Sequence, residues 1–478
     1  MKVNIENLGT IKSGSFSTNE LTIIFGKNNS GKTYLSYATY IIAKKFNDAV
    51  NRESRIAETI KAAEFSNRTE SLVTQFKIQL SDLLKPTAYS KINRSFNSFL
   101  ADGFCVKTDF FKNTKINLDY ISILSVAEKK EMLSKVMHPL GNKLAFIQKE
   151  KNSNEINITM TPIEPNSAED YEQGVIDFIN DHFFFLITGE IVSSLFELGI
   201  SNPFIITSER TGVELFYPEL DNNRSNIAEE FLRNSLVLKS HKKRTSANVQ
   251  NIFEKNISKY SLPVADNIRA IRNGNLQERK SEFSETNNYY LIRETLSKMI
   301  KGEFVRSESG NTTFLIHNNL GDQEAEIPLQ VASSSIKAMS FIDLYINKLA
   351  PKNGTLIIDE PELNLHPDNQ IIMAELIVRL VNSGIKVIMT THSDYIVREI
   401  NNRIKLYKIK DNKEQIENFV AHSADILPPQ NVNVFNITCD GEIEPIIVSD
   451  YGMESVIFDD VIISAAERED NVNYIVEP

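Results

Sequence analysis

Cysteine and long apolar runs are scarce in this sequence. The two cysteines, Cys105 and Cys439, can form neither a disulfide framework nor a four-ligand zinc site. The most apolar stretch, His182–Ile187, is far shorter than the roughly 18 residues of a membrane-spanning helix. The N-terminus shows no basic-then-apolar signal peptide. We therefore expect a cytoplasmic protein with two free thiols.

An excess of positive charge is also missing. Lys and Arg number 52 against 63 Asp and Glu, which gives a formal net charge of −11. The protein as a whole is therefore not an electrostatic nucleic-acid binder. A local basic patch remains open at His241–Arg244, for which the alternative is an ordinary solvated face.

One octapeptide near the start, Gly26–Thr33, fits the pattern Gly-x-x-x-x-Gly-Lys-Thr. The run Leu21–Phe25 before it predicts a buried strand, and Tyr34–Phe46 after it, free of Gly and Pro, predicts a helix. In this context the pattern binds phosphate, because backbone N–H groups and the helix N-terminus point at the anion. A Gly-rich turn before a helix is the alternative. The flanking elements favour a nucleotide site.

The residue types of this loop indicate their roles. Lys32 is expected to reach the β- and γ-phosphates, and the Thr33 hydroxyl to ligate Mg²⁺. The residues expected to contact the nucleotide are Gly26, Asn28, Asn29, Ser30, Gly31, Lys32, Thr33 and Tyr34.

A second set of polar residues lies beyond residue 350. Leu356–Ile358 predicts an apolar strand that ends in Asp359 and Glu360. Two carboxylates at a strand end suit nucleotide hydrolysis, one in the Mg²⁺ shell and the next polarising the attacking water. Because side chains alternate along a strand, both cannot point at the metal. We expect Asp359 to order the metal and Glu360 to act as general base.

Two more loops follow predicted strands. Val387–Thr390 predicts a strand that leads into His392, which can donate to a γ-phosphate oxygen. A histidine taken alone is more often a surface residue, but its place one helix and one strand after the acidic pair favours a functional role. The charged loop Ser208–Gly212 follows a predicted strand at 203–206 and is either a loop over a site or a surface turn.

The phosphate loop and the acidic strand lie over 300 residues apart. Only one phosphate loop exists, so we infer one ATPase with an inserted segment rather than two ATPases. Apolar residues recur at helical spacing over about 50–100, and further helices are expected near Val126–Val136 and over about Glu169–Leu198. With 478 residues, 41% of them apolar, the chain can form two or three packed units.

These motifs together resemble a known family. Gly26–Thr33, Leu356–Glu360 with Pro361–Pro367, and Thr390–Ser393 resemble the Walker A, Walker B and His-switch motifs of ABC-type ATPases. They are most similar to the SMC/RecF branch, and especially to the OLD-like ("overcoming lysogenisation defect") AAA ATPases of bacterial anti-phage systems. The resemblance implies an α/β fold: an ABC-type P-loop ATPase head, with a mixed central sheet, helices on both sides and an antiparallel β subdomain, carrying a large, mainly helical insertion.

The resemblance is specific over about residues 1–45 and 325–405, and it implies hydrolysis of ATP with Mg²⁺. The expected domains are an N-terminal lobe with Walker A at 1–48, a mainly helical insertion at 49–202, a return strand with the Ser-Glu-Arg loop at 203–216, a second helical insertion at 217–301, and a C-terminal lobe with the remaining motifs at 302–478.

The stretch Leu329–Ala338 sits where such proteins carry their signature motif, with Ser335 in the place of a glycine. In that family the signature serine of one subunit caps the ATP held by the other. The resemblance therefore implies that Ser333 acts in trans in a homodimer. The run Ser208–Gly212 also resembles a Ser/Ala-Glu-Arg-Ser/Thr-Gly motif of these ATPases.

The Toprim nuclease domain of OLD-family nucleases is not recognisable, since too few residues follow the His switch. They predict strands at Val434–Thr438 and Ile443–Val448 and a short terminal helix, with Asp459-Asp460 as its N-terminal charge pair rather than a metal site. The leading hypothesis is an anti-phage sensor or scaffold that controls a separately encoded effector such as a nuclease. The alternatives are a DNA-binding repair or maintenance ATPase of the RecF/SMC kind and a non-hydrolysing ATP-dependent assembly protein.

Overall fold

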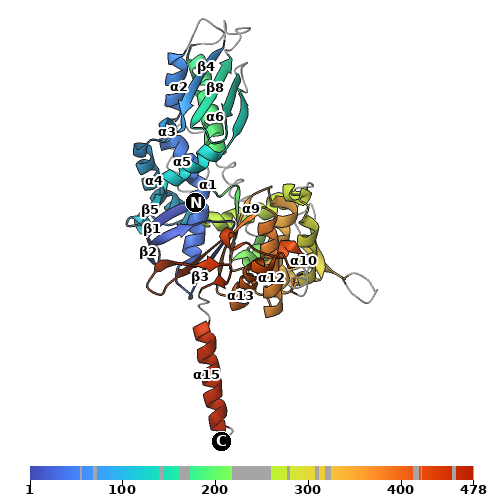
Figure 1. The fold of residues 1–478 in the computed structure, drawn as a ribbon. Helices are drawn as coiled ribbons and strands as arrows, with labels where there is room; N and C mark the ends of the chain where they lie inside the picture. Colours follow the sequence, from blue (N-terminus) through green and yellow to red (C-terminus); the bar gives the residue numbers. More distant parts are fainter. Residues whose placement is uncertain are drawn as a thin grey trace, which may run out of the picture. The chain divides into compact units, whose positions relative to one another are not determined.

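The chain divides into two units, and the candidate site lies in the second. The first unit comprises Met1–Thr18, Ala38–Ala101 and Lys107–Pro203, and the second comprises Asn19–Tyr37, Asp102–Val106 and Phe204–Pro478. Figure 1 labels several helices and strands of both units. The computed structural model describes residues 1–53, 56–67, 73–138, 144–161, 173–196, 198–217, 260–276, 280–306, 312–317, 325–412, 419–420, 422–454 and 459–476.

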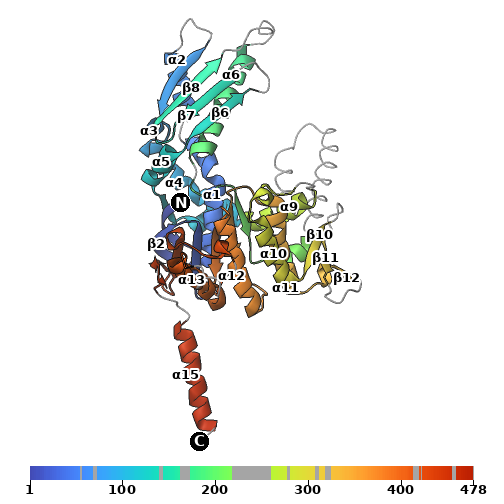
Figure 2. The ribbon, with the colours of Figure 1, turned by 45° about the vertical axis from the view of Figure 1, so that its right-hand side comes forward.

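Strands with alternating polar and apolar residues form two antiparallel groups in the first unit, three strands of the nine-stranded sheet and a separate four-stranded sheet. The strands β1 (Lys2–Leu8), β2 (Ile11–Ser17) and β5 (Lys115–Leu118) pair in the order β5-β1-β2. The second sheet has the order β4-β8-β7-β6 and consists of β4 (Thr74–Gln79), β6 (Met132–Met137), β7 (Leu144–Lys149) and β8 (Glu155–Thr161). Helix α2 (Ile56–Ser66) packs on β4 and helix α6 (Gln173–Leu195) packs on β6, as Figure 2 shows.

Two predictions in this unit are wrong. The helical spacing over about 50–100 fails at β4, where Phe76 and Ile78 are buried and Lys77 is exposed, which is the alternation of a strand. The helix expected near Val126–Val136 is instead α5 (Tyr120–Lys129), followed by strand β6. It starts earlier because the Asp119 side chain caps it by accepting from backbone N–H groups in its first turn. The remaining helices of the segment are α3 (Leu80–Leu83) and α4 (Pro86–Phe104).

Continuous apolar strands form the centre of the second unit. The strands β3 (Leu21–Gly26), β13 (Thr355–Asp359) and β14 (Lys386–Thr391) are almost wholly buried, as parallel strands covered on both faces are. With β9 (Pro203–Ile206), β15 (Val432–Ile437) and β16 (Glu442–Ile446), they lie in the order β16-β15-β3-β14-β13-β9. β15, β3, β14 and β13 are parallel, whereas β16 is antiparallel to β15. The carboxyl ends of β3, β13 and β14 therefore lie at one edge of the sheet.

Helices supply the rest of the core of the second unit. Apolar side chains of α9 (Leu262–Leu276), α10 (Tyr289–Ile300), α11 (Ser334–Leu344), α12 (Pro367–Asn382) and α13 (Asp394–Leu406) form one buried cluster with those of β3, β13, β14 and β15. Helix α1 (Lys32–Glu53) begins after β3. Three further strands, β10 (Gly302–Arg306), β11 (Thr312–Ile316) and β12 (Ala325–Pro328), form a small antiparallel sheet.

The expected α/β fold with a mixed central sheet and antiparallel β elements is confirmed. The strands expected at Val434–Thr438 and Ile443–Val448 are β15 and β16, and the expected terminal helix is α15 (Asp459–Val476). The basic run His241–Arg244 and the part of the second helical insertion at 218–259 lie outside the described residues.

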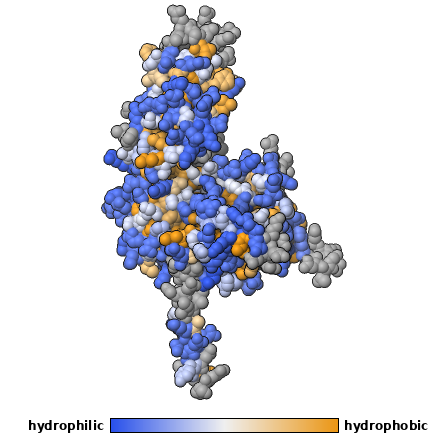
Figure 3. Space-filling view, viewed as in Figure 1, coloured by the Kyte–Doolittle hydropathy of each residue, from blue (hydrophilic) through white to orange (hydrophobic). Residues whose placement is uncertain are grey.

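Hydrophilic residues dominate the face drawn in Figure 3, and hydrophobic residues are scattered among them. Among the described helices, none is both long and apolar enough to cross a membrane.

Candidate functional site

The loop after β3 folds around the side chain of Lys32. This residue begins α1, and its Nζ donates to the carbonyl oxygens of Gly26 (2.9 Å) and Lys27 (3.0 Å). Gly26 and Gly31 have φ values of +153° and +110°, which residues with a side chain rarely adopt. A Cβ on Gly26 would also lie 2.6 Å from the Ile437 carbonyl oxygen. The glycines thus allow a tight loop at a helix N-terminus, an arrangement that favours anions.

Thr33, the next residue of the helix, meets the end of β13. Its Oγ1 donates to Asp359 Oδ2 at 3.1 Å, although the two residues are 326 positions apart in the chain. Thr390, at the end of β14, donates to the other carboxylate oxygen. Asp359 is fully buried, and burial raises the pKa of its carboxyl above the usual range, although the Thr390 and Thr33 hydroxyls oppose that shift. The first turn of α1 and the end of β14 therefore both contact the carboxylate at the end of β13.

Glu360 leaves the strand in a left-handed backbone conformation, with φ +52°. For a residue with a side chain this conformation costs about 1–3 kcal/mol unless the surroundings hold it. Its N–H donates to the Thr390 carbonyl oxygen and to Thr390 Oγ1, both at 3.2 Å. Its carboxylate lies 3.6 Å from Nδ1 of His392, a side chain that is 46% exposed. The two carboxylates therefore diverge, with Asp359 facing Thr33 and Glu360 facing His392, but because of this backbone bend and not because of alternation along a strand.

A third carboxylate, Glu362, was not singled out from the sequence. Its Oε1 accepts from Thr391 Oγ1 (2.9 Å) and from the His392 N–H (2.7 Å), and it lies 3.2 Å from His392 Nδ1. The residue is 6% exposed, and burial raises the pKa of its carboxyl. Glu362 thus holds both the backbone and the ring of His392. The only sequence signal for it was its place two residues after the acidic pair.

The Ser-Glu-Arg loop proves to be part of the site rather than a surface turn. Arg210 is 1% exposed and donates to the backbone carbonyls of Asp359 (2.9 Å) and Glu360 (2.7 Å). The preceding Glu209 accepts from the Tyr37 hydroxyl at 2.7 Å, and burial, reinforced by this carboxylate, raises the pKa of Tyr37. The loop therefore packs directly beneath the acidic strand end.

Lys32 is buried close to these carboxylates. Burial lowers the pKa of its ammonium, while Glu360, Asp359 and Glu362 each favour the charged form. The ammonium of the phosphate loop and the carboxylates at the end of β13 thus lie close enough to influence one another's ionisation.

The remaining loop residues occupy different positions. Ser30 and Gly31 are buried, whereas Asn28 and Asn29 are exposed at the tip of the loop. Tyr34, in the first turn of α1, stacks on Phe104 with ring centroids 5.4 Å apart. These positions leave the loop tip accessible to a ligand.

Ser333 does not join this cluster within the described part of the chain. It caps α11, where its hydroxyl accepts from the Ile336 N–H at 3.3 Å and lies 2.9 Å from Ser335 Oγ. Both contacts are local, and no hydrogen bond among the described residues links Ser333 to the acidic strand end. Any contact between Ser333 and a nucleotide stays a prediction.

The donor set around Thr33 suits Mg²⁺. A hydroxyl and a carboxylate are hard oxygen ligands, and Mg²⁺ typically takes one or two such protein ligands together with waters and substrate phosphates. No group of three or more His, Cys, Asp or Glu side chains placed to hold a metal occurs among the described residues. Thr33 and Asp359 are thus the residues that fit this ion.

A glycine loop at a helix N-terminus, facing strand-end carboxylates, defines a P-loop nucleotide-binding protein. The chain belongs to the AAA ATPase domain family, which it matches over residues 1–397. No curated protein sequence matches it.

Two solved structures of SMC head domains are similar to the chain at low identity. The first, the SmcHead bound to the C-winged helix domain of ScpA, is 12% identical with a TM-score of 0.32, covering 93% of this chain and 96% of that one. The second is an Smc head domain with an extended coiled coil, bound to the C-terminal domain of ScpA derived from Pyrococcus furiosus. It is 12% identical with a TM-score of 0.28, covering 98% of both chains.

Proposed function

We propose that this protein binds ATP with Mg²⁺ and hydrolyses it to ADP and phosphate. The observation that carries the proposal is the contact between Thr33 and Asp359. It joins the phosphate loop to the acidic strand end, with Glu360 and His392 beside it. Membership of the AAA ATPase domain family supports the same activity.

Each residue then has one role. Lys32 binds the phosphates, and Thr33 and Asp359 hold Mg²⁺, which when bound would neutralise phosphate charge. Glu360 accepts a proton from the attacking water at its carboxylate. His392 donates a hydrogen bond to the γ-phosphate, oriented by Glu362. The partial exposure of the Glu360 and His392 side chains is compatible with contact to a substrate.

The site is completed in this proposal by a second copy of the chain. Ser333 is exposed at the N-terminus of α11, where it is free to face a nucleotide held by another subunit. ATP-dependent closure of two heads would then control a partner. The homodimer rests on the family resemblance, in which Ser335 stands in the place of the signature glycine.

We further propose an OLD-like anti-phage sensor or scaffold whose partner is a separately encoded effector such as a nuclease. What supports this role is the resemblance of the Walker A, Walker B and His-switch motifs to those of OLD-like ATPases. Co-purification at native expression, with ATP and without it, tests the role. Capture of a nuclease only with ATP supports it, and ATP-independent recovery of the chain alone contradicts it.

Steady-state phosphate release tests the enzymatic part. Glu360→Gln should lower turnover by about 10²–10⁴-fold, as loss of a general base does, while ATP binding persists. Glu326→Gln, at an exposed position on β12, is the matched control and should keep the parental rate. Parental turnover in Glu360→Gln would refute the assignment. ATP binding by the unaltered protein without phosphate release would favour a non-hydrolysing assembly protein.

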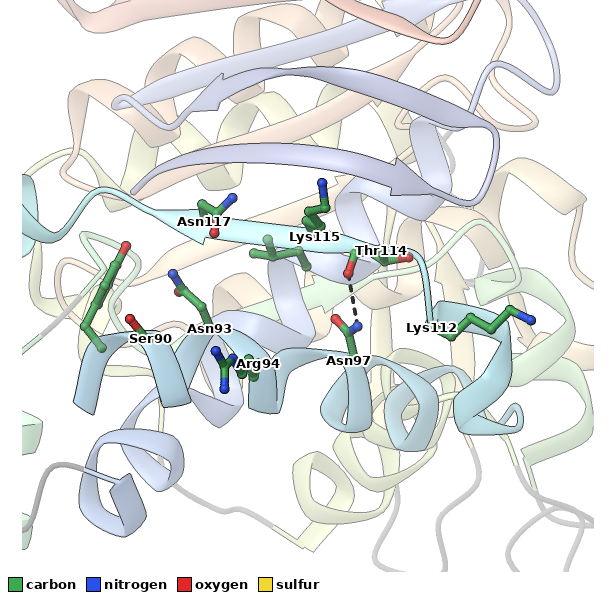
Figure 4. Close-up of a pocket in the computed structure, with 10 residues that line it drawn as sticks. Ser90, Asn93, Arg94, Asn97, Lys112, Thr114, Lys115 and Asn117 are labelled. Atoms are coloured by element: carbon green, nitrogen blue, oxygen red, sulfur yellow. Dashed lines mark hydrogen bonds between the residues drawn. The ribbon is translucent and has the colours of Figure 1, made fainter. Parts of the chain in front are cut away.

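A DNA-binding maintenance ATPase is the second candidate, favoured by a groove in the first unit. The groove has a volume of about 550 Å³ and lies between α4 and β5 (Figure 4). Arg94, Lys112 and Lys115 line it, and none of the described lining residues is Asp or Glu. Lys115 is partly neutralised by Glu6, whose carboxylate lies 2.6 Å from its Nζ. The groove thus offers local positive charge on an acidic protein.

DNA-binding assays at several salt concentrations test this candidate. A DNA affinity that rises as the salt concentration falls would favour this candidate. The slope of log affinity against log salt concentration should then become shallower by about 0.9 in each of the variants Arg94→Ser and Lys112→Ser. Lys301→Ser, outside the groove, is the control. Absence of binding at low salt would contradict it.

A further inference from the structure

The guanidinium of Arg210 is buried against backbone carbonyl oxygens. Nη1 donates to the carbonyl oxygens of Thr207 (3.2 Å) and Asp359 (2.9 Å), and Nη2 donates to that of Glu360 (2.7 Å). Thr207 follows β9, Asp359 ends the neighbouring strand β13, and Glu360 follows it directly. One side chain therefore fastens two adjacent strand ends.

One of these carbonyls belongs to the residue with the unusual backbone. Glu360 has φ +52°, and its peptide is held on both sides: its N–H by Thr390 and its carbonyl by Arg210. The bend interrupts strand alternation and directs the Glu360 carboxylate toward His392 while Asp359 faces Thr33. The position of the Glu360 carboxylate thus depends on a bend that Arg210 supports.

The charge of Arg210 is also well placed. Burial lowers the pKa of its guanidinium to about 10, while Glu362, Asp359, Glu360 and Glu209 favour the charged form. The side chain is therefore still a cation near neutral pH and offsets repulsion among these carboxylates. Lysine cannot replace it, because a single ammonium lacks the planar fork that reaches separate carbonyls.

We propose that Arg210 is a positioning residue for ATP hydrolysis, which acts by holding the backbone bend of Glu360 and does not touch the nucleotide. This rests on the proposed ATPase function. Loss of Arg210 should therefore reduce kcat through Glu360 and leave ATP affinity nearly unchanged.

The test is a double-mutant cycle in the full-length protein, read out as phosphate release and fluorescent-ATP binding. Arg210→Lys should lower kcat about 10–100-fold, since a misplacement near 1 Å costs about that much. The Kd for ATP should stay within about threefold. In a Glu360→Gln background the same substitution should have almost no further effect, because the residue it positions is already disabled.

Arg379→Lys is the matched control. Arg379 lies on helix α12 and is also buried, but its Nε and Nη2 donate to the carboxylate of Asp425. Its replacement should lower the melting temperature and leave kcat unchanged. Arg210→Gln, which buries no unpaired ammonium, is the second test variant and should also lower kcat.

Each outcome decides a separate point. If the parent turns over ATP and folded Arg210→Lys has the same kcat, the positioning role alone is overturned. The same holds if Arg210→Lys lowers kcat in the Glu360→Gln background by as much as it does in the parent. If both Arg210 variants fail to fold while Arg379→Lys folds, Arg210 is a structural residue and the proposal is wrong. Absence of turnover in the parent overturns the ATPase function itself.

Discussion

Replacing Glu362 by alanine should impair the function of His392, although His392 itself is unchanged. The Glu362 carboxylate accepts from Thr391 Oγ1 at 2.9 Å and from the His392 N–H at 2.7 Å. Alanine leaves two donors unpaired at about 1–3 kcal/mol each, a gross cost of about 2–6 kcal/mol. Removing a carboxylate whose pKa is raised by burial offsets part of this cost. We therefore expect Glu362→Ala to lose about 2 kcal/mol of unfolding free energy, the lower end of the gross cost.

The catalytic effect follows from the ring contact. His392 Nδ1 lies 3.2 Å from Glu362 Oε1, so alanine releases the ring, and kcat should fall about 10–100-fold. Glu362→Gln keeps an acceptor oxygen at the same place and is the matched control. It should retain both donors and stay within about threefold of the parental kcat, because the ring remains oriented.

The assay combines phosphate release with chemical denaturation of both variants. A folded Glu362→Ala protein with parental kcat would refute the claim that Glu362 orients His392. Equal losses in Glu362→Ala and Glu362→Gln would show that the negative charge, rather than the acceptor, is what matters.

Three further predictions concern the loop and its carboxylate. Thr33→Val should weaken Mg²⁺-dependent ATP binding about tenfold or more, whereas Thr33→Ser keeps the hydroxyl and most of the affinity; equal affinities in a titration with and without Mg²⁺ would contradict the metal assignment. Burial raises the pKa of Asp359, so the unfolded chain ionises at the ordinary value of 3.8 while the folded protein holds the proton to higher pH. The ionised group then costs stability above the raised pKa, and this cost disappears below the ordinary one. Asp359→Asn should therefore melt higher than the parent near pH 8, by a margin that shrinks toward about pH 4; a margin independent of pH would be the contrary result. Gly26→Ala should destabilise by about 1–3 kcal/mol, because its Cβ would lie 2.6 Å from the Ile437 oxygen at a φ of +153°. Gly189→Ala in α6, where a Cβ meets nothing within 4 Å, is its control and should be neutral or stabilising.

Much of the site could be predicted because its parts are local patterns. The strand before Gly26, the helix after it and the apolar strand that ends at Asp359 each follow from a few neighbouring residues. Patterning was less reliable in the insertion. Val73, Phe76 and Leu80 fit a helical period, whereas Phe76 and Ile78 fit the period of a strand, and only the pairing of β4 with β8 settles the choice.

The contacts of Arg210 and Glu362 could not be predicted from such patterns, although the loop that contains Arg210 was a candidate. An arginine in a sequence is normally expected at the surface. Arg210 is buried because its guanidinium donates to backbone carbonyl oxygens at the end of another strand. Glu362 is one of several polar residues after the acidic pair, and only its contact with the His392 backbone distinguishes it.

The sequence by itself determined the chemistry of the site: a lysine and a threonine in a glycine loop, and two carboxylates at a strand end, because these depend on residues adjacent in the chain. The tertiary structure alone decided that Thr33 meets Asp359 across 326 positions, and that Glu360 bends away from it. Both depend on the order of strands β3, β14 and β13 and on a single backbone angle. Neither is encoded in the spacing of polar and apolar residues, since that spacing reports which face of an element is buried and not which element lies beside it.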